Sequence, residues 1–294
     1  MARSSTPRRT VVKDFPPLSL FARDGETYVP TTATPGPWSP AVCHGGAVAA
    51  LMAHLLEEAS TPELESLRFS LDFLRPVPTA PLKARVRPVR QGRRTHLIEG
   101  ELLASGAVVA RGTLLRFRAA DSGMEPRSHL SDAPPADEPG DFAFHDAIRN
   151  GNGHRQFMAG GIEVRVPGGD TFVGARAGWF RLLLPVLPGV APSPMVRVAA
   201  AADHGSGLGS LAHPSEARRI TYANADLAIH LARPASGPWV RVEATSRWSA
   251  GRSGLTNSVI SDAMGPLGVG QQLVAIEHLD LPAFNSRTTA AATA

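Results

Sequence analysis

Residues 199–204 read Ala-Ala-Ala-Ala-Asp-His, which places one acidic side chain directly after a run of four alanines. Alanine is the strongest helix former, so the run predicts a helix that starts near Pro194. A carboxylate on the buried side of that helix is costly unless other polar groups bind it. A carboxylate held by amide side chains can position a water molecule and partly deprotonate it. Asp203 is therefore our candidate for a general base, and the alternative is a residue that only ends the helix before Gly205.

A second candidate is the start of an earlier helix, His44-Gly45-Gly46. The two glycines allow close approach to the backbone and leave the first amide N–H groups of the helix accessible. Such N–H groups can donate to an oxyanion that develops during a reaction. We expect His44, Gly45 and Gly46 to contact a substrate carbonyl, and the alternative is a loop histidine that binds a local backbone group.

The single cysteine and the remaining histidines give weaker signals. Cys43 adjoins His44, but no pattern of a thiol hydrolase accompanies it, so we expect a buried, inert thiol. The other histidines, His204 and His230 among them, lack the spacing of metal ligands. The sequence therefore predicts neither a metal site nor another cofactor.

The elements that must position these residues occur twice along the chain. The Arg-Pro pairs that begin at Arg75 and Arg233 lie 158 residues apart, and the turn glycines Gly106 and Gly265 lie 159 apart. Solenoid repeats have periods of about 20–50 residues, so a repeat of this length indicates a duplicated domain.

Each half reads as one helix followed by about four strands. In the first half we expect a buried helix over 46–58 and strands near 67–73, 83–90, 94–104 and 107–118. In the second half we expect strands near 162–166 and 176–184, the alanine-rich helix, and strands near 219–232, 239–248, 255–262 and 267–277.

A small-residue helix wrapped by a long antiparallel sheet is the hotdog arrangement, and two copies predict an α+β double hotdog with the sheets edge to edge. The predicted parts are an N-terminal hotdog domain over 15–118, a linker over 119–140 and a C-terminal hotdog domain over 141–280. The segments 1–14 and 285–294 are expected to be flexible tails.

Composition limits the classes of function. The 294 residues are 43% hydrophobic and 19% charged, as in a soluble globular protein, and no apolar run is long enough for a membrane helix. The net charge is only +4, and the arginines are scattered, so nucleic-acid binding is not expected. One cysteine fits a reducing compartment, and we expect a cytoplasmic protein without a membrane partner.

Several short motifs, taken in their order along the chain, allow a comparison with a known protein family. The first half contains His44-Gly-Gly-Ala-Val-Ala-Ala-Leu and Phe73-Leu-Arg-Pro-Val-Pro. The second contains Gly178-Trp-Phe-Arg-Leu, Ala199-Ala-Ala-Ala-Asp-His-Gly, Asn224-Ala-Asp-Leu and Gly265-Pro-Leu-Gly-Val-Gly-Gln-Gln-Leu. Together these motifs resemble the double-hotdog acyl-CoA thioesterase family over most of the chain, about 36–276.

The resemblance implies three catalytic side chains, because the thioesterase II pattern of this family uses an Asp on the second helix, a Thr on the next strand and a Gln on the last strand. Asp203 matches the Asp, and Asn224 stands where the family has Thr. Gln272 matches the Gln, although the neighbouring Gln271 leaves the register open by one residue. Asp226 could replace Asn224 in its role. Trp179 is interpreted as a core aromatic or as part of an acyl tunnel.

The reaction implied is hydrolysis of an acyl-CoA, or another acyl thioester, without a cofactor. A non-catalytic acyl-thioester binding protein is the first alternative, which Asn224 at the Thr position favours. A hydratase or dehydratase is the second, but it needs an Asp/His pair near a helix start, and the sequence shows no obvious Asp partner for His44. Further assembly into a homo-oligomer is left open.

Overall fold

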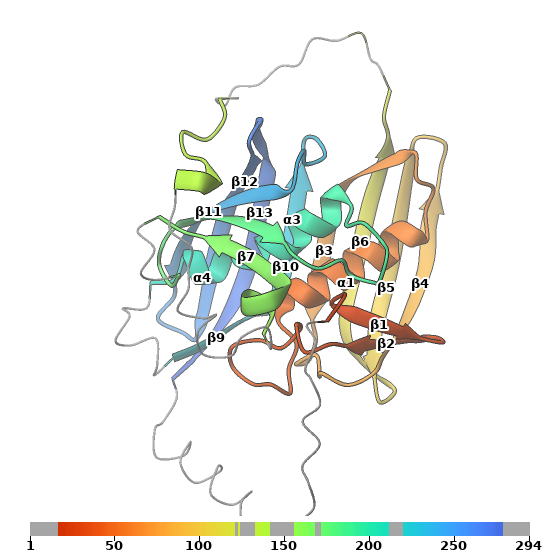
Figure 1. Ribbon diagram of the computed structural model, residues 1–294, viewed down its shortest axis with the longest axis horizontal. Coiled ribbons are helices and arrows are strands. Elements are labelled where there is room, and N and C mark those ends of the chain that lie inside the picture. Colours follow the sequence, from red (N-terminus) through yellow and green to blue (C-terminus); the bar gives the residue numbers. More distant parts are fainter. Residues whose placement is uncertain are drawn as a thin grey trace, which may run out of the picture.

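One large antiparallel sheet runs through the protein, and two helices lie side by side against one of its faces (Figure 1). The computed structural model describes residues 17–120, 123, 133–141, 156–167, 172–211 and 220–278. The tails predicted at 1–14 and 285–294 and part of the predicted linker lie outside the described residues. The arrangement confirms the predicted α+β double hotdog.

The first half contains one long helix and six strands. They are β1 (Phe21–Asp24), β2 (Thr27–Pro30), α1 (Gly45–Glu58), β3 (Leu64–Phe73), β4 (Leu82–Gln91), β5 (Thr95–Ala104) and β6 (Ala107–Arg118). The sequence analysis missed the short β1–β2 hairpin, which begins the sheet and pairs with β4.

The second half repeats this plan. It contains β7 (Ile162–Arg165), β8 (Ala177–Leu182), α3 (Pro194–Ala202), the short α4 (Gly205–Leu208), β9 (Ile220–Asn224), β10 (Asp226–Leu231), β11 (Trp239–Trp248), β12 (Ser253–Asp262) and β13 (Gly265–His278). The strand predicted over 219–232 is divided at Ala225 into β9 and β10, which pair with β13 at different positions.

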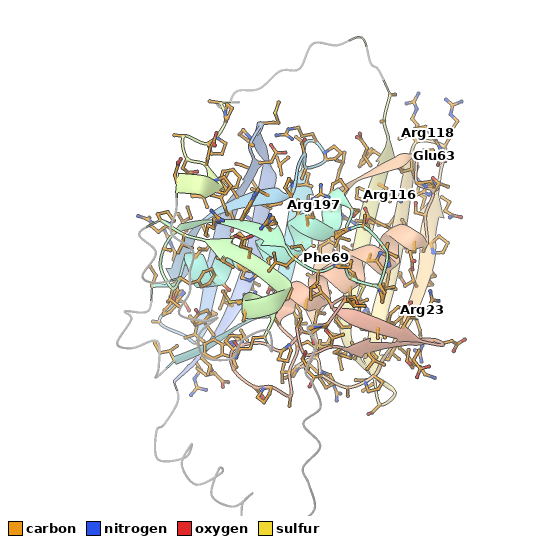
Figure 2. All side chains as sticks on the ribbon, in the orientation of Figure 1. Arg23, Glu63, Phe69, Arg116, Arg118 and Arg197 are labelled. Atoms are coloured by element: carbon orange, nitrogen blue, oxygen red, sulfur yellow. The ribbon has the colours of Figure 1, made fainter. Side chains whose placement is uncertain are left out.

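The two halves join through β3 and β10, which form an antiparallel pair in the middle of the sheet. The strand order is β1-β2-β4-β5-β6-β3-β10-β13-β12-β11-β8-β7, and β9 pairs with β13 beside this path. Leu71 lies opposite Leu227, and Phe69 lies opposite Ile229. All four are buried and belong to one hydrophobic core shared by both halves; Figure 2 labels Phe69.

The helices fill the concave side of the sheet. In α1 every residue from Gly46 to Leu56 is buried, as its nearly all-apolar sequence predicts. At the far end of α1, Glu57 accepts hydrogen bonds from Ser66 of β3 and from Ser193, which caps the start of α3. This contact holds the two helices side by side with their starts at opposite ends of the pair.

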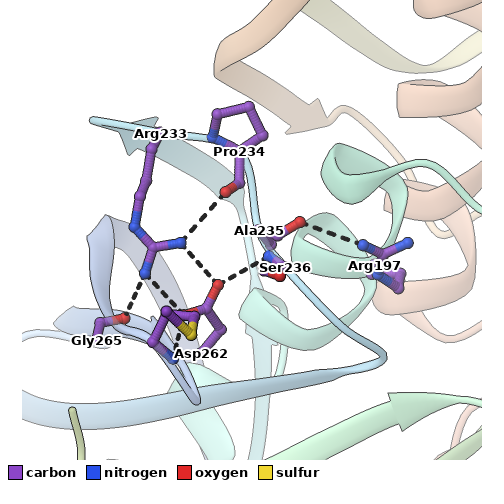
Figure 3. A network of polar contacts seen from close by, with 8 residues as sticks. Arg197, Arg233, Pro234, Ala235, Ser236, Asp262 and Gly265 are labelled. Atoms are coloured by element: carbon purple, nitrogen blue, oxygen red, sulfur yellow. Dashed lines mark hydrogen bonds and ion pairs between the residues drawn. The ribbon is translucent and has the colours of Figure 1, made fainter.

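The Arg-Pro pair of the second half forms a rigid corner between β10 and β11 (Figure 3). Arg233 donates two hydrogen bonds, of 2.7 and 2.8 Å, to the two carboxylate oxygens of Asp262. That carboxylate is wholly buried and also accepts from the backbone N–H groups of Ser236 and Met264. The corner therefore has a structural role. No helix of the described residues is long and apolar enough to cross a membrane.

Candidate active site

The start of α1 meets the end of α3 in the interior, so residues from both halves come together there. A Cβ atom on Gly45 would lie 2.5 Å from Oδ1 of Asp203, and one on Gly46 would lie 2.7 Å from the carbonyl oxygen of Ala200. Such distances leave no room for a side chain. The two glycines are therefore required for the close contact between the helix ends.

Asp203 ends α3 and is also buried, so the two readings of this residue are not exclusive. It is the C-terminal cap of the helix, and only 4% of its surface is exposed. Nδ2 of Asn224 donates to Oδ1 of Asp203 at 2.8 Å and to its backbone oxygen at 3.0 Å. Nε2 of Gln272 donates to the same backbone oxygen at 3.0 Å. The structure thus brings the three side chains together.

The strand register decides between the two adjacent glutamines. Gln272 faces inward and is 1% exposed, whereas Gln271 faces outward and donates to Asn257 at 2.9 Å. Oε1 of Gln272 and Oδ1 of Asn224 are buried and accept no hydrogen bond from the described residues. Buried acceptors without donors are costly, so these two atoms are suited to binding a polar group of a ligand or a water molecule.

His44 caps α1 and lies against the same carboxylate. Its Nδ1 is 3.0 Å from the backbone nitrogen of Gly46 and 3.3 Å from Oδ2 of Asp203. Nδ1 cannot accept from the amide and donate to the carboxylate at once. We assign a proton to Nδ1, because a nitrogen lone pair facing a buried carboxylate would be repulsive.

The surroundings of Asp203 keep it ionised. Burial raises the pKa of this carboxyl, but the hydrogen bond and charge of His44, with a further hydrogen bond from Asn224, outweigh burial and hold the pKa below its ordinary value. The nearby N-terminus of α1 also favours a negative charge. A base must be deprotonated before it can accept a proton, and Asp203 meets that condition.

His204 is a site residue that the sequence analysis missed. Its ring stacks on His44 at 4.7 Å and lies 4.7 Å from the ring of Phe180. Burial lowers the pKa of His204 to about 3, so the ring is neutral, with Nδ1 donating to the carbonyl oxygen of Ala200 at 3.1 Å. The signal in the sequence that could have found His204 is its position directly after Asp203.

Asp226 and Trp179 are not brought to Asp203. Oδ1 of Asp226 accepts from the backbone N–H of Leu273 at 2.6 Å. Asn224 ends β9 and Asp226 begins β10, so the two residues lie in different strands. The expectation that Asp226 could replace Asn224 in its role is corrected accordingly.

Trp179 faces the side of β8 that lies away from the helices. Its Nε1 donates at 3.1 Å to Asp137, which lies within the predicted linker. Successive strand residues point to opposite faces, and Phe180 is the one that reaches His204. The acyl-tunnel reading of Trp179 is therefore corrected, and the core reading fits the structure.

Cys43 has the inert character that we expected. The thiol is buried, and burial raises its pKa to about 11. Its sulfur lies 3.5 Å from the carbonyl oxygen of Pro78. A thiol that stays protonated is a poor nucleophile, so Cys43 takes no part in the chemistry considered below.

The shared sheet, the paired helices and the polar cluster between their ends define a double-hotdog protein. Residues 34–117 match the acyl-CoA thioesterase N-terminal domain, and residues 130–276 match the acyl-CoA thioesterase C-terminal domain. These matches cover most of the chain. The protein belongs to the acyl-CoA thioesterase family, whose members are thioester hydrolases.

Solved structures show the same fold at low sequence identity. A putative thioesterase II from Thermobifida fusca is 17% identical with a TM-score of 0.65, covering 88% of this chain and 96% of its own. A putative thioesterase from Novosphingobium aromaticivorans is 22% identical with a TM-score of 0.63, covering 89% and 99%. Acyl-CoA thioesterase II TesB2 from Mycobacterium marinum is 18% identical with a TM-score of 0.59, covering 80% and 90%. No curated protein matches the chain.

Proposed function

We propose that the protein hydrolyses acyl-CoA thioesters with a water molecule that Asp203 activates. The observation that carries this proposal is the buried, ionised carboxylate of Asp203, bound by Asn224 and adjacent to two acceptors without donors. Water would donate one hydrogen to the carboxylate and the other to Oδ1 of Asn224 or Oε1 of Gln272. Such an arrangement fixes the water and increases its nucleophilicity.

In the proposed reaction the water oxygen attacks the thioester carbonyl carbon while its proton passes to Asp203. The carbonyl oxygen becomes an oxyanion, and the N–H of Gly45 is the donor that we assign to it. That N–H has no acceptor among the described residues, whereas the N–H of Gly46 lies against Nδ1 of His44. When the intermediate collapses, the C–S bond breaks and the thiolate of coenzyme A leaves, taking the proton from Asp203.

The test is release of free thiol from acyl-CoAs of several chain lengths. Asp203→Asn should lower kcat at least about 100-fold, because it removes the base and keeps the shape of the side chain. Gln272→Ala should lower kcat about 10-fold, since it removes one water acceptor and one hydrogen bond to Asp203. Gln271→Ala is the matched control on the outer face and should leave kcat unchanged. Equal rates for wild type and Asp203→Asn would refute the assignment of the base.

A hydratase or dehydratase is the second candidate, because the structure supplies what the sequence did not show. His44 and Asp203 form an Asp/His pair at the start of α1, with 3.3 Å between Nδ1 and Oδ2. Incubation with an enoyl-CoA separates the two reactions. Loss of the conjugated double bond without thiol release would favour hydration, and thiol release from a saturated acyl-CoA favours hydrolysis. Tight binding of acyl-CoA with neither reaction would favour the binding protein that Asn224 had suggested.

Three further parts of the proposal rest on the sequence and the family. A role in lipid metabolism follows from the acyl-CoA substrate. A cytoplasmic location rests on the single, buried cysteine. Assembly into a homo-oligomer remains a prediction for measurement in solution.

A further inference from the structure

The corner after β3 connects segments that adjoin two residues of the candidate site. The backbone N–H of Phe73 donates to the carbonyl oxygen of Ala225 at 2.9 Å, directly beside Asn224. At the other end of the corner, the carbonyl oxygen of Val77 accepts from the residue that precedes His44, at 2.8 Å. Residues 73–77 are therefore anchored next to a site residue at each end, and Arg75 lies in the middle.

The position of Arg75 follows from the reach of the chain. It lies two positions along the chain from each anchor, Phe73 and Val77, and two residues span at most about 7 Å. Leu74, Arg75 and Pro76 are exposed, although both anchors are fixed by hydrogen bonds. The exposed Arg75 thus belongs to the surface that adjoins the proposed active site, here called its rim.

Arg75 is an unpaired cation, in contrast to its counterpart in the second half. Arg233 binds the buried carboxylate of Asp262, but the position equivalent to Asp262 in the first half, 158 residues earlier, is Ala104. The backbone N–H of Arg75 donates to the carbonyl oxygen of Val109 at 3.1 Å, but its guanidinium group makes no hydrogen bond or ion pair with the described residues. The structural partner of the Arg-Pro corner is therefore missing where the corner adjoins the site.

An exposed aromatic ring lies on the same rim. Trp38, in the loop that leads to His44, is 52% exposed. Its ring meets the ring of Tyr222 edge to face at 5.6 Å, and Tyr222 is two residues before Asn224 on β9. Residues 40 and 41 of the same loop accept hydrogen bonds from Thr79, just after the Arg75 corner. The loop and the corner thus form one continuous rim.

We propose that Arg75 and Trp38 bind the nucleotide end of coenzyme A, with Arg75 on a phosphate group and Trp38 on the adenine ring. The inference rests on the proposed function, which places the thioester between the helix ends. One guanidinium group can donate two parallel hydrogen bonds to a phosphate group, and aromatic side chains stack on bases. The pantetheine arm would pass from this rim inward to Asp203.

The experiment compares an acyl-CoA with the same acyl group on pantetheine, which lacks both phosphate and adenine. Arg75→Gln and Trp38→Ala should each raise KM for the acyl-CoA about 10-fold or more, the loss expected for one charge-assisted hydrogen bond or one stacked base. Neither should change kcat/KM for the acyl-pantetheine. Arg90→Gln is the matched control: Arg90 is exposed near the opposite end of the sheet and should leave both substrates unaffected.

Titration of the wild type and variants with coenzyme A itself separates this inference from the proposed function. If no thioester is hydrolysed, the hydrolase proposal fails. Weaker binding of coenzyme A by Arg75→Gln would still support the nucleotide site that we propose at the rim. Unchanged coenzyme A affinity in Arg75→Gln and Trp38→Ala would overturn the rim, whatever the hydrolytic rates. An equal loss of kcat/KM for the acyl-CoA and the acyl-pantetheine would also overturn the proposed nucleotide site. Such a loss would indicate a disturbed fold, which affects substrates with and without the nucleotide alike.

Discussion

Contacts of single residues explain why the site was only partly visible in the sequence. Asp203 stood out because a carboxylate after four alanines needs partners, and the structure supplies Asn224. Gln272 could be distinguished from Gln271 only through the register of β13, which depends on pairing with distant strands. His204 escaped notice because its role comes from stacking on His44, a residue of the other half. The local sequence pattern identifies Asp203, whose burial is energetically costly, but it does not identify the residues that bind it.

The buried His204 should make the stability of the protein depend on acidity. An unfolded histidine binds a proton below its ordinary pKa of 6.5, whereas burial holds the pKa of His204 in the folded protein to about 3. Between these values the unfolded state binds the extra proton, so stability falls as pH falls, by up to about 1.4 kcal/mol per pH unit. His204→Phe should flatten this slope in denaturant titrations across that window.

The exposed His230 provides the control for that measurement. His230→Gln should keep the wild-type slope, because the substitution leaves the buried ring of His204 in place. A slope that is identical in wild type and His204→Phe would contradict the buried, neutral state of the ring.

At the scale of elements, most of the fold follows from the sequence. The long strands β4, β5, β6 and β11 were predicted to within a few residues, because their alternation and their turn glycines agree. The break between β9 and β10 was not predicted, although the large apolar residues change from even positions, Ile220 and Tyr222, to odd positions from Leu227 onward. That break matters for function, since it lets Asn224 face Asp203 while β10 pairs with β3.

The two Arg-Pro corners should differ in their contribution to stability. Arg233→Ala leaves the buried carboxylate of Asp262 without its ion pair and should lower the free energy of unfolding by about 3 kcal/mol. We expect the lower part of the usual range because Arg233 is itself 35% exposed. Arg75→Ala removes no such partner and should change stability by less than about 0.5 kcal/mol.

Chemical denaturation of both variants measures this difference directly. Similar losses at the two corners would mean that Arg75 has a structural partner after all. The direction of the pH dependence of stability is also fixed. Burial raises the pKa of Asp262, but the hydrogen bonds from Arg233 and the two backbone amides outweigh burial and lower it. The stability that ionised Asp262 contributes is therefore lost as pH falls through the acid range.

For the whole molecule, the duplication leaves one polar cluster suited to catalysis. Ser193 and His44 both cap helices, and counting from each cap makes His54 the counterpart of Asp203. The 158-residue repeat then makes Ser66 the counterpart of Asn224. Leu114 likewise takes the place of Gln272. The positions equivalent to Asp203, Asn224 and Gln272 thus hold no Asp, Asn or Gln, and the carboxylate of Glu57, three residues after His54, binds Ser66 and Ser193 instead.

The number of ligands bound per chain tests this asymmetry. Calorimetric titration of Asp203→Asn with an acyl-CoA should give one equivalent per chain, since the variant keeps the shape of the side chain but loses the base. Two equivalents would show that the pocket at the other end of the helix pair, which His54, Glu57 and Ser193 line, also accepts the thioester. The concentration of folded protein must be calibrated independently for this measurement.

The contact between the start of α1 and the end of α3 has an evolutionary consequence. In a symmetric pair of separate chains, any change at one helix tip is copied at the other, so both must remain compatible with the same reaction. Joining the copies into a single polypeptide removes that constraint. At one end of the helix pair, the hydrogen bond between Ser193 and Glu57 then has only a structural role. Selection for catalysis could act on the opposite end alone.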